Sequence, residues 1–168
     1  MDLLEGSAGT WQHLLGDVDA DTLVVFGLLE ALARSWKAMH SRALAPFGLN
    51  HAEWTAIVML RTSLPDHRRS PTELRHLVGQ TSAGMTRILR KLTLEGLVTR
   101  EQRTDDERGR DVILTDAGQR LADTSFQAMQ TIQRASLAGL SDAEMRATTK
   151  TLHRLAAALT AERTAERT

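Results

Sequence analysis

Hydroxyl and guanidinium groups gather on one side of residues 82–95, a segment with the periodicity of an amphipathic helix. Its apolar residues recur at intervals of three and four positions and therefore share one face, made by Met85, Ile88, Leu89 and Leu92. The opposite face carries Ser82, Thr86, Arg87, Arg90 and Lys91. Such side chains hydrogen-bond to phosphate oxygens and base edges. The chemistry that they suggest is nucleic-acid recognition.

Small residues precede and open this segment, in the run Thr81-Ser82-Ala83-Gly84. A helix that reads DNA brings its N-terminal turn against the base edges. Small side chains and free N–H groups let that end approach the groove and a phosphate. Taken alone, the segment could equally be an ordinary surface helix with a polar face, so the choice depends on its neighbours.

The residues that follow predict a β-hairpin. Two β-prone runs, 97–103 and 110–114, flank the polar turn 104–109, which contains Gly109. Arg103, Arg108 and Arg110 gather near its tip. A charged turn by itself is usually only a solvated loop. A hairpin directly after a helix with a small-residue start is typical of a winged helix-turn-helix.

A second helix is predicted immediately before the reading helix. Ser70 and Glu73 have the spacing of a capping box, and Pro71 falls at the first helical position. Gly79 stands where a helix should stop. We therefore expect residues 70–115 to form a helix pair followed by a wing.

The residues needed for catalysis are missing from the sequence. The chain has no Cys, and it lacks a G-x-S-x-G motif and a phosphate-binding loop. Its six His are scattered and are expected on helix surfaces; His67 and His76 could approach each other, but no cluster of carboxylates accompanies them. We expect no enzymatic activity, no cofactor and no metal site.

The charge is distributed unevenly along a chain whose formal net charge is zero. Residues 68–110 hold ten basic and six acidic residues, an excess of four positive charges that the remainder of the chain balances. A local basic surface suits DNA binding. Without a long apolar run or a signal-peptide pattern at the start, the sequence predicts no membrane span and a cytoplasmic location.

Helices are predicted on both sides of the winged unit. They cover residues 21–45, 51–62 and 116–138 and a last helix after 142, with a short helix at about 10–15 because Gly6 and Gly9 interrupt the start. The helix at 21–45 is apolar around much of its circumference, which implies burial on more than one side. We therefore expect a homodimer with two reading helices about one DNA turn (~34 Å) apart on a palindromic site.

Several motifs resemble the MarR family of bacterial transcriptional regulators, from about residue 20 to 160. They are Gly48-Leu49-Asn50, Ser70-Pro71-Thr72-Glu73-Leu74, Thr81-Ser82, Thr86-Arg87, Gly96-Leu97-Val98, Asp106-Glu107-Arg108 and Leu114-Thr115-Asp116-Ala117-Gly118. The resemblance implies a mainly α fold with a small β wing, in which a winged helix-turn-helix lobe joins a helical dimerisation lobe. It also implies a dimer that reads a pseudo-palindromic operator in double-stranded DNA, usually as a repressor that a small ligand releases.

The resemblance also assigns roles to individual residues. Arg108 would enter the minor groove, and Asp106 would hold the wing by pairing with a neighbouring Arg. Ser82, Ala83, Met85, Thr86 and Arg87 would face the major groove, with Arg87 the best placed for a guanine contact. Ser70, Thr72 and Arg90 would meet phosphates. The DNA-binding set is completed by Thr81, Arg103 and Arg110.

A narrower resemblance is to the urate-responsive PecS and HucR type within this family. Trp11 corresponds to the Trp of that branch's additional N-terminal helix, and Arg100 to its pocket arginine. Thr55 stands where that branch has an acidic residue, so a urate site is not implied. Trp11, Thr55 and Arg100 remain a ligand-site hypothesis for a flat anionic aromatic, either phenolic or purine-like. Trp11 could instead only pin the N-terminal helix to the core.

Together these observations predict one MarR-type domain over residues 1–168. Residues 1–48 and 116–160 would form the dimerisation region, residues 49–115 the DNA-binding lobe, and residues 161–168 a frayed tail. The function expected is a sequence-specific dimeric repressor released by a small anionic or aromatic ligand. The alternative is a constitutive or architectural DNA-binding protein without a working ligand pocket.

Overall fold

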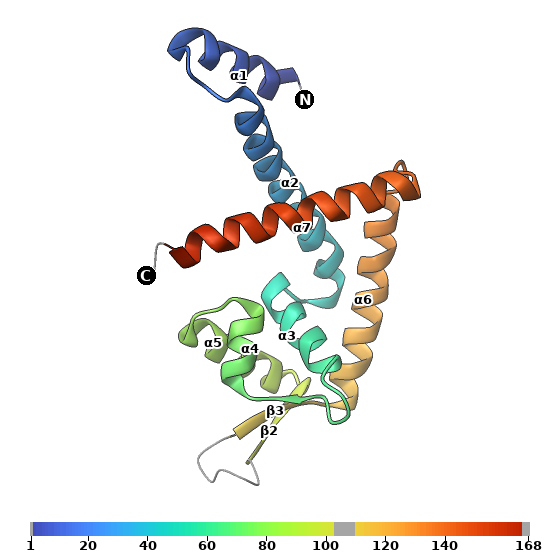
Figure 1. Cartoon of the computed structure of the whole chain (residues 1–168). Coiled ribbons are helices and arrows are strands. Elements are labelled where there is room, and N and C mark those ends of the chain that lie inside the picture. The colour runs from blue at the N-terminus through green and yellow to red at the C-terminus, as the bar shows by residue number, and fades with distance from the viewer. Residues whose placement is uncertain (1, 103–109, 166–168) are drawn as a thin grey trace. The chain divides into compact units, whose positions relative to one another are not determined.

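The computed structural model describes residues 2–102 and 110–165 and shows a mainly helical chain with one small antiparallel sheet (Figure 1). This is the fold class that the sequence predicts. The chain divides at Met129 into two compact units. The first holds the helices and strands around the predicted reading helix, and the second is helical.

The N-terminal helix is longer than the sequence suggested. Helix α1 spans Asp2–Leu15, so the expectation of a short helix at 10–15 was wrong. Gly6 and Gly9 each weaken a helix by about 1 kcal/mol relative to Ala. They do not break this one, because α1 packs on α2 and buries Ala8 between them. Tertiary packing outweighs the local preference of the two glycines.

Helix α2 spans Ala20–Leu44, close to the predicted 21–45. Asp19 caps it by accepting a hydrogen bond from the backbone N–H of Thr22 at 3.1 Å. The short helix η1 (Ala45–Phe47) and Gly48 at φ +66° then turn the chain into α3 (His51–Arg61). A capping box between Asn50 and Glu53 fixes the start of α3, as its spacing predicts.

The helix pair also follows the sequence prediction. Strand β1 (Arg68–Arg69) leads into α4 (Pro71–Val78), where Ser70 and Glu73 form the predicted capping box. Gly79 ends α4 at φ +67°. Helix α5 (Ser82–Leu94) is capped by Thr81, whose hydroxyl accepts from the N–H of Gly84 at 3.1 Å. The buried core of this part is apolar and includes Leu60, Leu74, Ile88, Leu89 and Leu92.

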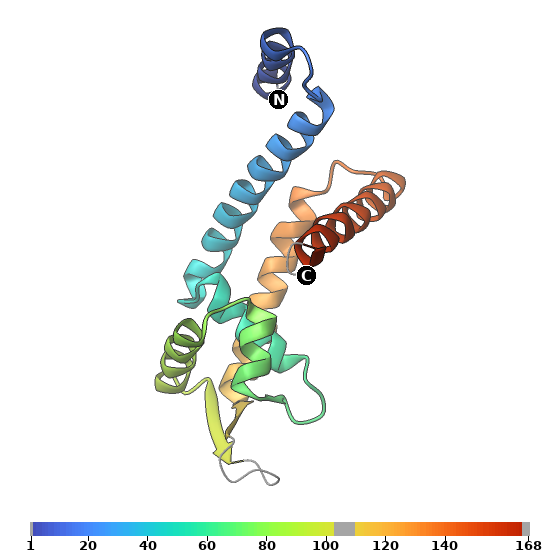
Figure 2. The same ribbon diagram turned by 60° about the vertical axis from the view of Figure 1, so that its left-hand side comes forward.

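The sheet joins the wing to the strand before α4. Strand β2 (Val98–Gln102) pairs antiparallel with β3 (Arg110–Leu114), and β3 pairs with β1, which gives the order β1-β3-β2. Val98 lies opposite Leu114 and Gln102 opposite Arg110. The loop at 64–69 therefore ends in a short strand that joins the wing. In Figure 2 the long yellow strand β2 extends away from the green helices α4 and α5.

Helix α6 (Asp116–Ser136) begins in a close contact with the sheet. The hydroxyl of Thr115 accepts from the N–H of Gly118 at 3.1 Å and donates to the carbonyl of Gly96 at 2.8 Å. A Cβ atom on Gly118 would lie 2.1 Å from the carbonyl oxygen of Leu97. The residue must therefore be glycine, because no side-chain atom fits between helix and sheet.

Helix α7 spans Asp142–Ala165 in the second unit. Ser141 and Glu144 form a capping box at its start, in which the N–H of Ser141 donates to the Glu144 carboxylate at 2.8 Å and the N–H of Glu144 donates to the Ser141 hydroxyl. The helix extends to Ala165. The frayed tail expected at 161–168 stays a prediction, and residues 166–168 lie outside the described part. Among the described helices, none is sufficiently long and apolar to cross a membrane.

Candidate nucleic-acid interface

The polar face of α5 is exposed along its length. Its exposed residues are Thr81, Ser82, Ala83, Thr86, Arg87 and Arg90, all members of the predicted DNA-binding set. Thr86 donates a hydrogen bond to the carbonyl of Ser82 at 2.9 Å, one turn earlier. The N-terminal turn of α5 is thus lined with small side chains and open to solvent.

Met85 departs from the prediction that it faces the major groove. Met85 is only 2% exposed, and it packs in the core with Ile88 and Leu89. The same helical spacing that puts Ser82 and Thr86 outside turns Met85 inward. Placing Met85 in the groove was therefore wrong, and its position on the apolar stripe was the better guide.

A groove runs between α4, α5 and strand β2, and several predicted contact residues line it. The groove is lined by Pro71, Thr72, Arg75, Ser82, Met85, Thr86, Leu89 and Arg100. Of these, Thr72, Ser82, Met85 and Thr86 belong to the predicted DNA-binding set. Thr72 is exposed, whereas Ser70 is half-buried and its hydroxyl both accepts from the N–H of Glu73 and donates to its carboxylate. Thr72 is thus better placed than Ser70 for a phosphate contact. Arg100 lies beside the reading helix.

Lys91 of α5 makes contacts within the protein, whereas Arg87 and Arg90 are exposed. Its ammonium group donates to the carboxylate of Glu53 at 2.7 Å and to the carbonyl of Gly48 at 2.8 Å. The hydrogen bond to Glu53 raises the pKa of Lys91 above its usual range, and nearby Glu95 adds to the effect. Glu53 is buried, so this pair ties α5 to the start of α3.

The described strands of the wing carry further charges. Arg110 is exposed at the start of β3. Arg68 of β1 pairs with Glu101 of β2 at 3.1 Å and with Asp111 of β3 at 3.9 Å, so one guanidinium spans all three strands. These pairs could not be read from the sequence, because they depend on strand register. The predicted wing residues Arg103, Asp106 and Arg108 lie outside the described residues.

The residues of the ligand-site hypothesis lie on three different elements. Trp11 is on α1 and 52% exposed, Thr55 is on α3, and Arg100 is on β2. Thr55 donates its hydroxyl to the carbonyl of His51 at 2.8 Å, within its own helix. Arg100 lines the groove beside α5, and neither Trp11 nor Thr55 lines that groove.

A cluster of aromatic and imidazole rings joins α2 to α3, and sequence reasoning missed it. His40 is 2% exposed, which corrects the expectation that the histidines lie on helix surfaces. Its ring lies 3.8 Å from that of Trp36, and its Nδ1 atom is 3.1 Å from Nδ1 of His51. Trp54 stands edge-on to His40 and stacks with Phe126 of α6.

Two polar atoms in this ring cluster are buried without a hydrogen-bond partner among the described residues, His40 Nε2 and Trp54 Nε1. Burial lowers the pKa of His40, and the neighbouring His51 lowers it further. The spacing of His40 and His51, on two different helices, gave no sequence signal for the pair. The two rings meet because the turn at Gly48 folds α3 back against α2.

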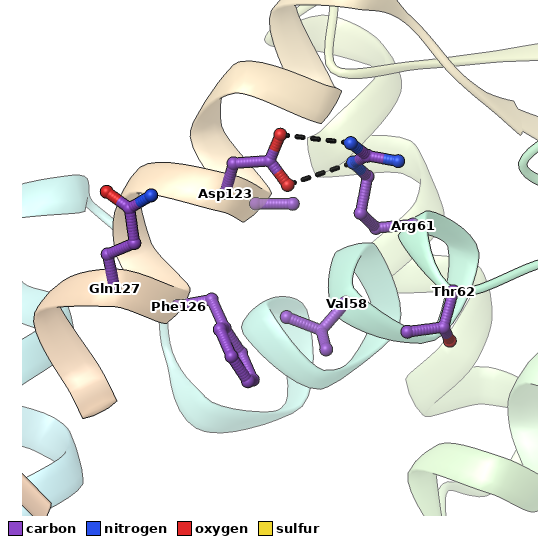
Figure 3. A pocket seen from close by; sticks show the side chains of 7 residues that line it. Val58, Arg61, Thr62, Asp123, Phe126 and Gln127 are labelled. Carbon is purple, nitrogen blue, oxygen red and sulfur yellow. Dashed lines mark hydrogen bonds and ion pairs between the residues drawn. The ribbon is translucent and has the colours of Figure 1, made fainter.

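A second cavity, of about 290 Å³, opens between α3 and α6 (Figure 3). Its floor is apolar, with Val58, Ala122 and Phe126, and an ion pair between Arg61 and Asp123 stands at its rim. Within the described residues, no group of three or more His, Asp or Glu side chains is arranged to hold a metal ion.

Comparison with known proteins points to transcriptional regulators. A scan against protein-family models finds no match. The chain is 32% identical over 102 residues to the HTH-type transcriptional repressor YetL of Bacillus subtilis, a match covering 61% of this chain and 60% of YetL. The match thus spans about three fifths of that relative.

Solved structures share the fold over most of their length. AbsC, a MarR family transcriptional regulator from Streptomyces coelicolor, superposes with a TM-score of 0.73 at 20% identity, covering 82% of this chain and 93% of AbsC. BpsR of Bordetella bronchiseptica, whose DNA binding is regulated by 6-hydroxynicotinic acid, gives 0.67 at 20% identity and covers 79% of this chain and 98% of BpsR. The chain has the winged helix-turn-helix fold of the MarR-family transcriptional regulators.

Proposed function

We propose that the protein is a dimeric, sequence-specific DNA-binding transcriptional regulator. The observation that carries the proposal is the exposed N-terminal half of α5, where Ser82, Thr86 and Arg87 stand clear of the core that its other face makes. Helices with such an end read base edges in the major groove. The repressor named among the relatives, YetL, supports repression as the form of regulation.

The contacts divide by chemistry into two kinds. Arg87 has the fork of donors that matches the O6 and N7 acceptors of guanine, so it is proposed to read sequence. Thr72, Arg90 and Arg110 are proposed to meet phosphates, which fix register and orientation. Arg100 lines the groove beside Thr72 and Ser82, which favours a phosphate contact for it as well.

The test begins with selection of bound DNA from a random pool, followed by gel-shift titration on the selected site. Arg87→Ala should weaken binding by about 1–3 kcal/mol and relax the preference at one base pair. Arg90→Ala should weaken binding to all sequences alike and make it less salt-dependent. Arg120→Ala, an exposed change of equal charge on α6, serves as the matched control. If Arg87→Ala and Arg90→Ala bind like the control, the DNA assignment is wrong.

Dimerisation is proposed to involve residues 1–48 and 116–160, and the DNA-binding lobe is proposed to span 49–115. Large apolar side chains on these flanking helices are exposed in the single chain, among them Leu23, Phe26, Leu32 and Leu152. Exposed apolar area on this scale marks an interface with another chain. Two copies related by a two-fold axis would read a pseudo-palindrome.

A small anionic aromatic compound is proposed to release the protein from DNA. The support is BpsR, a protein of the same fold that responds to 6-hydroxynicotinic acid. No urate site is proposed, because Thr55 lacks the carboxylate of the urate-responsive branch, and neither Thr55 nor Trp11 lines the groove that contains Arg100. A panel of phenolic and purine acids should include one that raises the unfolding temperature and releases DNA. Uniformly flat responses would favour the constitutive DNA-binding alternative.

A further inference from the structure

One arginine, at the last residue of α3, touches two other parts of the chain. The Nε and Nη2 atoms of Arg61 donate to the two carboxylate oxygens of Asp123 on α6, at 2.9 and 3.1 Å. Figure 3 shows this paired contact above the cavity. The remaining Nη1 atom lies 3.2 Å from Nε2 of His67, in the loop before β1. Arg61 therefore connects α6 with the entry to the sheet.

His67 in turn holds the last residue of the wing strand β3. Its backbone carbonyl accepts a hydrogen bond from the N–H of Leu114 at 3.1 Å, and its own N–H donates to the carbonyl of Ser63 at 2.6 Å. His67 thus contacts Arg61 through its side chain and β3 through its backbone. A continuous series of polar contacts therefore links Asp123, Arg61, His67 and Leu114.

The conformation of His67 is unfavourable by itself. Its φ is +51°, in the left-handed region that residues with a side chain rarely adopt. Because an arginine can only donate, Nε2 of His67 must accept, and the ring proton must sit on Nδ1. That Nδ1 atom is buried with no partner among the described residues. Strain of this kind persists where surrounding contacts enforce it, and it gathers at functional sites.

These contacts fix a geometry that the chain connection alone leaves free. Only Thr115 separates β3 from α6, so α6 could swing about its first turn. Thr115 and Gly118 seat that first turn on the sheet. Asp123 lies nearly two turns after the start of α6, and its carboxylate accepts the two hydrogen bonds from Arg61. Helix α6 is thus attached at two points along its length, and two points fix the direction of its axis. A single attachment at the first turn would leave that direction free.

We propose that Arg61, with Asp123 and His67, is a positioning residue that sets the angle between α6 and the wing sheet and thereby the affinity for DNA. The proposal rests on the proposed function. None of the three residues belongs to the exposed face of α5 or to the groove beside Arg100. They act on binding through the base of the wing and make no contact of their own with DNA.

The first test uses Asp123→Asn, which keeps the shape of the side chain and removes its charge. Removing a negative charge alone should leave DNA binding unchanged or strengthen it. The positioning role predicts the opposite, a loss of about two- to thirtyfold in affinity for the selected site. Asp116→Asn, an exposed carboxylate in the first turn of the same helix, is the matched control and should not lose affinity.

The second test separates positioning from stability. His67→Asn and His67→Gly remove the ring and suit a left-handed backbone better than His does. Both should weaken DNA binding as Asp123→Asn does, without a matching fall in Tm. Combining His67→Asn with Asp123→Asn should weaken binding less than the product of the single effects, because both interrupt one connection. The proposal would be overturned if these variants kept the wild-type affinity for DNA. It would also be overturned if each loss of affinity were in proportion to a loss in Tm.

A third readout does not depend on DNA. Amide hydrogen exchange at Leu114 should become faster in Asp123→Asn and in Arg61→Lys, whose single ammonium group cannot reach both partners. Unchanged protection at Leu114 would overturn the connection itself. Faster exchange in a protein that selects no DNA sequence would leave the connection intact and reject the proposed function, so the two failures are distinguishable.

Discussion

His40 is a titratable side chain in surroundings that disfavour its charge. It is buried between Trp36 and Trp54, and the other ring nitrogen within reach belongs to His51. Burial is the larger cause of its lowered pKa, and the charge of His51 is the smaller. The folded protein therefore holds His40 neutral at a pH where the unfolded chain would protonate it.

This difference makes stability depend on pH in a definite direction. Above the ordinary histidine pKa of about 6.5, both states are neutral at His40 and the folded state is fully favoured. Below it the unfolded chain takes up the proton first, so stability falls as the pH falls towards the lowered folded value. Thermal unfolding between neutral and mildly acidic pH should show this fall. His40→Gln should reduce the slope.

The exposed histidine His153 on α7 provides the control. His153→Gln should keep the wild-type pH dependence. Equal slopes in all three proteins would mean that other groups cause the acid destabilisation. A steeper slope in His40→Gln than in the wild type would also contradict the interpretation.

At single residues, sequence reasoning succeeded where one helix decides the outcome. The spacing within α5 is enough to place Thr86 and Arg87 outside and Ile88 inside. The same spacing places Met85 on the buried face, whereas the family resemblance implied a contact with the major groove. His40 and Arg61 could not be assigned, since their surroundings come from residues 11 and 62 positions away in the chain.

Among the elements, α6 makes a very close contact with the sheet at its first turn. Gly118 lies against the carbonyl of Leu97, which leaves no room for a Cβ atom. Gly118→Ala should therefore force the helix away from the sheet and destabilise the protein by about 2–3 kcal/mol. Chemical denaturation would measure the loss. DNA affinity should fall with it, because the wing is displaced.

Gly139, between α6 and α7, supplies the comparison for this change. A Cβ atom there would meet nothing within 4 Å. Gly139→Ala should stay within about 0.5 kcal/mol of the wild type. If the two variants were equally stable, the close approach at Gly118 would not be a constraint on the fold.

The boundaries of most elements followed from local chemistry. The capping boxes at Asn50, Ser70 and Ser141 were visible in the sequence, and each is formed. The start of α1 was missed because glycines suggested a break that packing against α2 overrides. The Leu-Thr-x-x-Gly motif is visible in the sequence, but only the structure explains its Gly118 as a point of helix–sheet contact.

For the whole molecule, the exposed apolar surface is the feature that demands a partner. Leu32 is 62% exposed in the middle of α2, with Phe26 and Trp36 also exposed on that helix. Leu32→Glu and Phe26→Glu should shift the protein from dimer to monomer in analytical ultracentrifugation. Losing the second half-site contact should cost roughly a hundredfold or more in affinity for a palindrome.

Leu94 at the end of α5 is even more exposed, at 81%, but lies outside the flanking helices. Leu94→Glu should therefore remain dimeric. A wild-type protein that sediments as a monomer at all concentrations would contradict the dimer. The sequence could predict that apolar helices flank the winged unit, but the division of the chain at Met129 emerges only in three dimensions.

The ring contact between Trp36 and His40 also gives the protein an internal optical probe. The chain has three Trp and no Tyr, so its ultraviolet fluorescence comes from tryptophan alone. Trp36 lies against an imidazole on one side and is partly open to solvent on the other. Its emission should respond to the protonation of His40 and to the covering of α2 by a second chain. Replacing Trp11 by Phe would simplify the spectrum, so that assembly and acid titration could be followed without an attached dye.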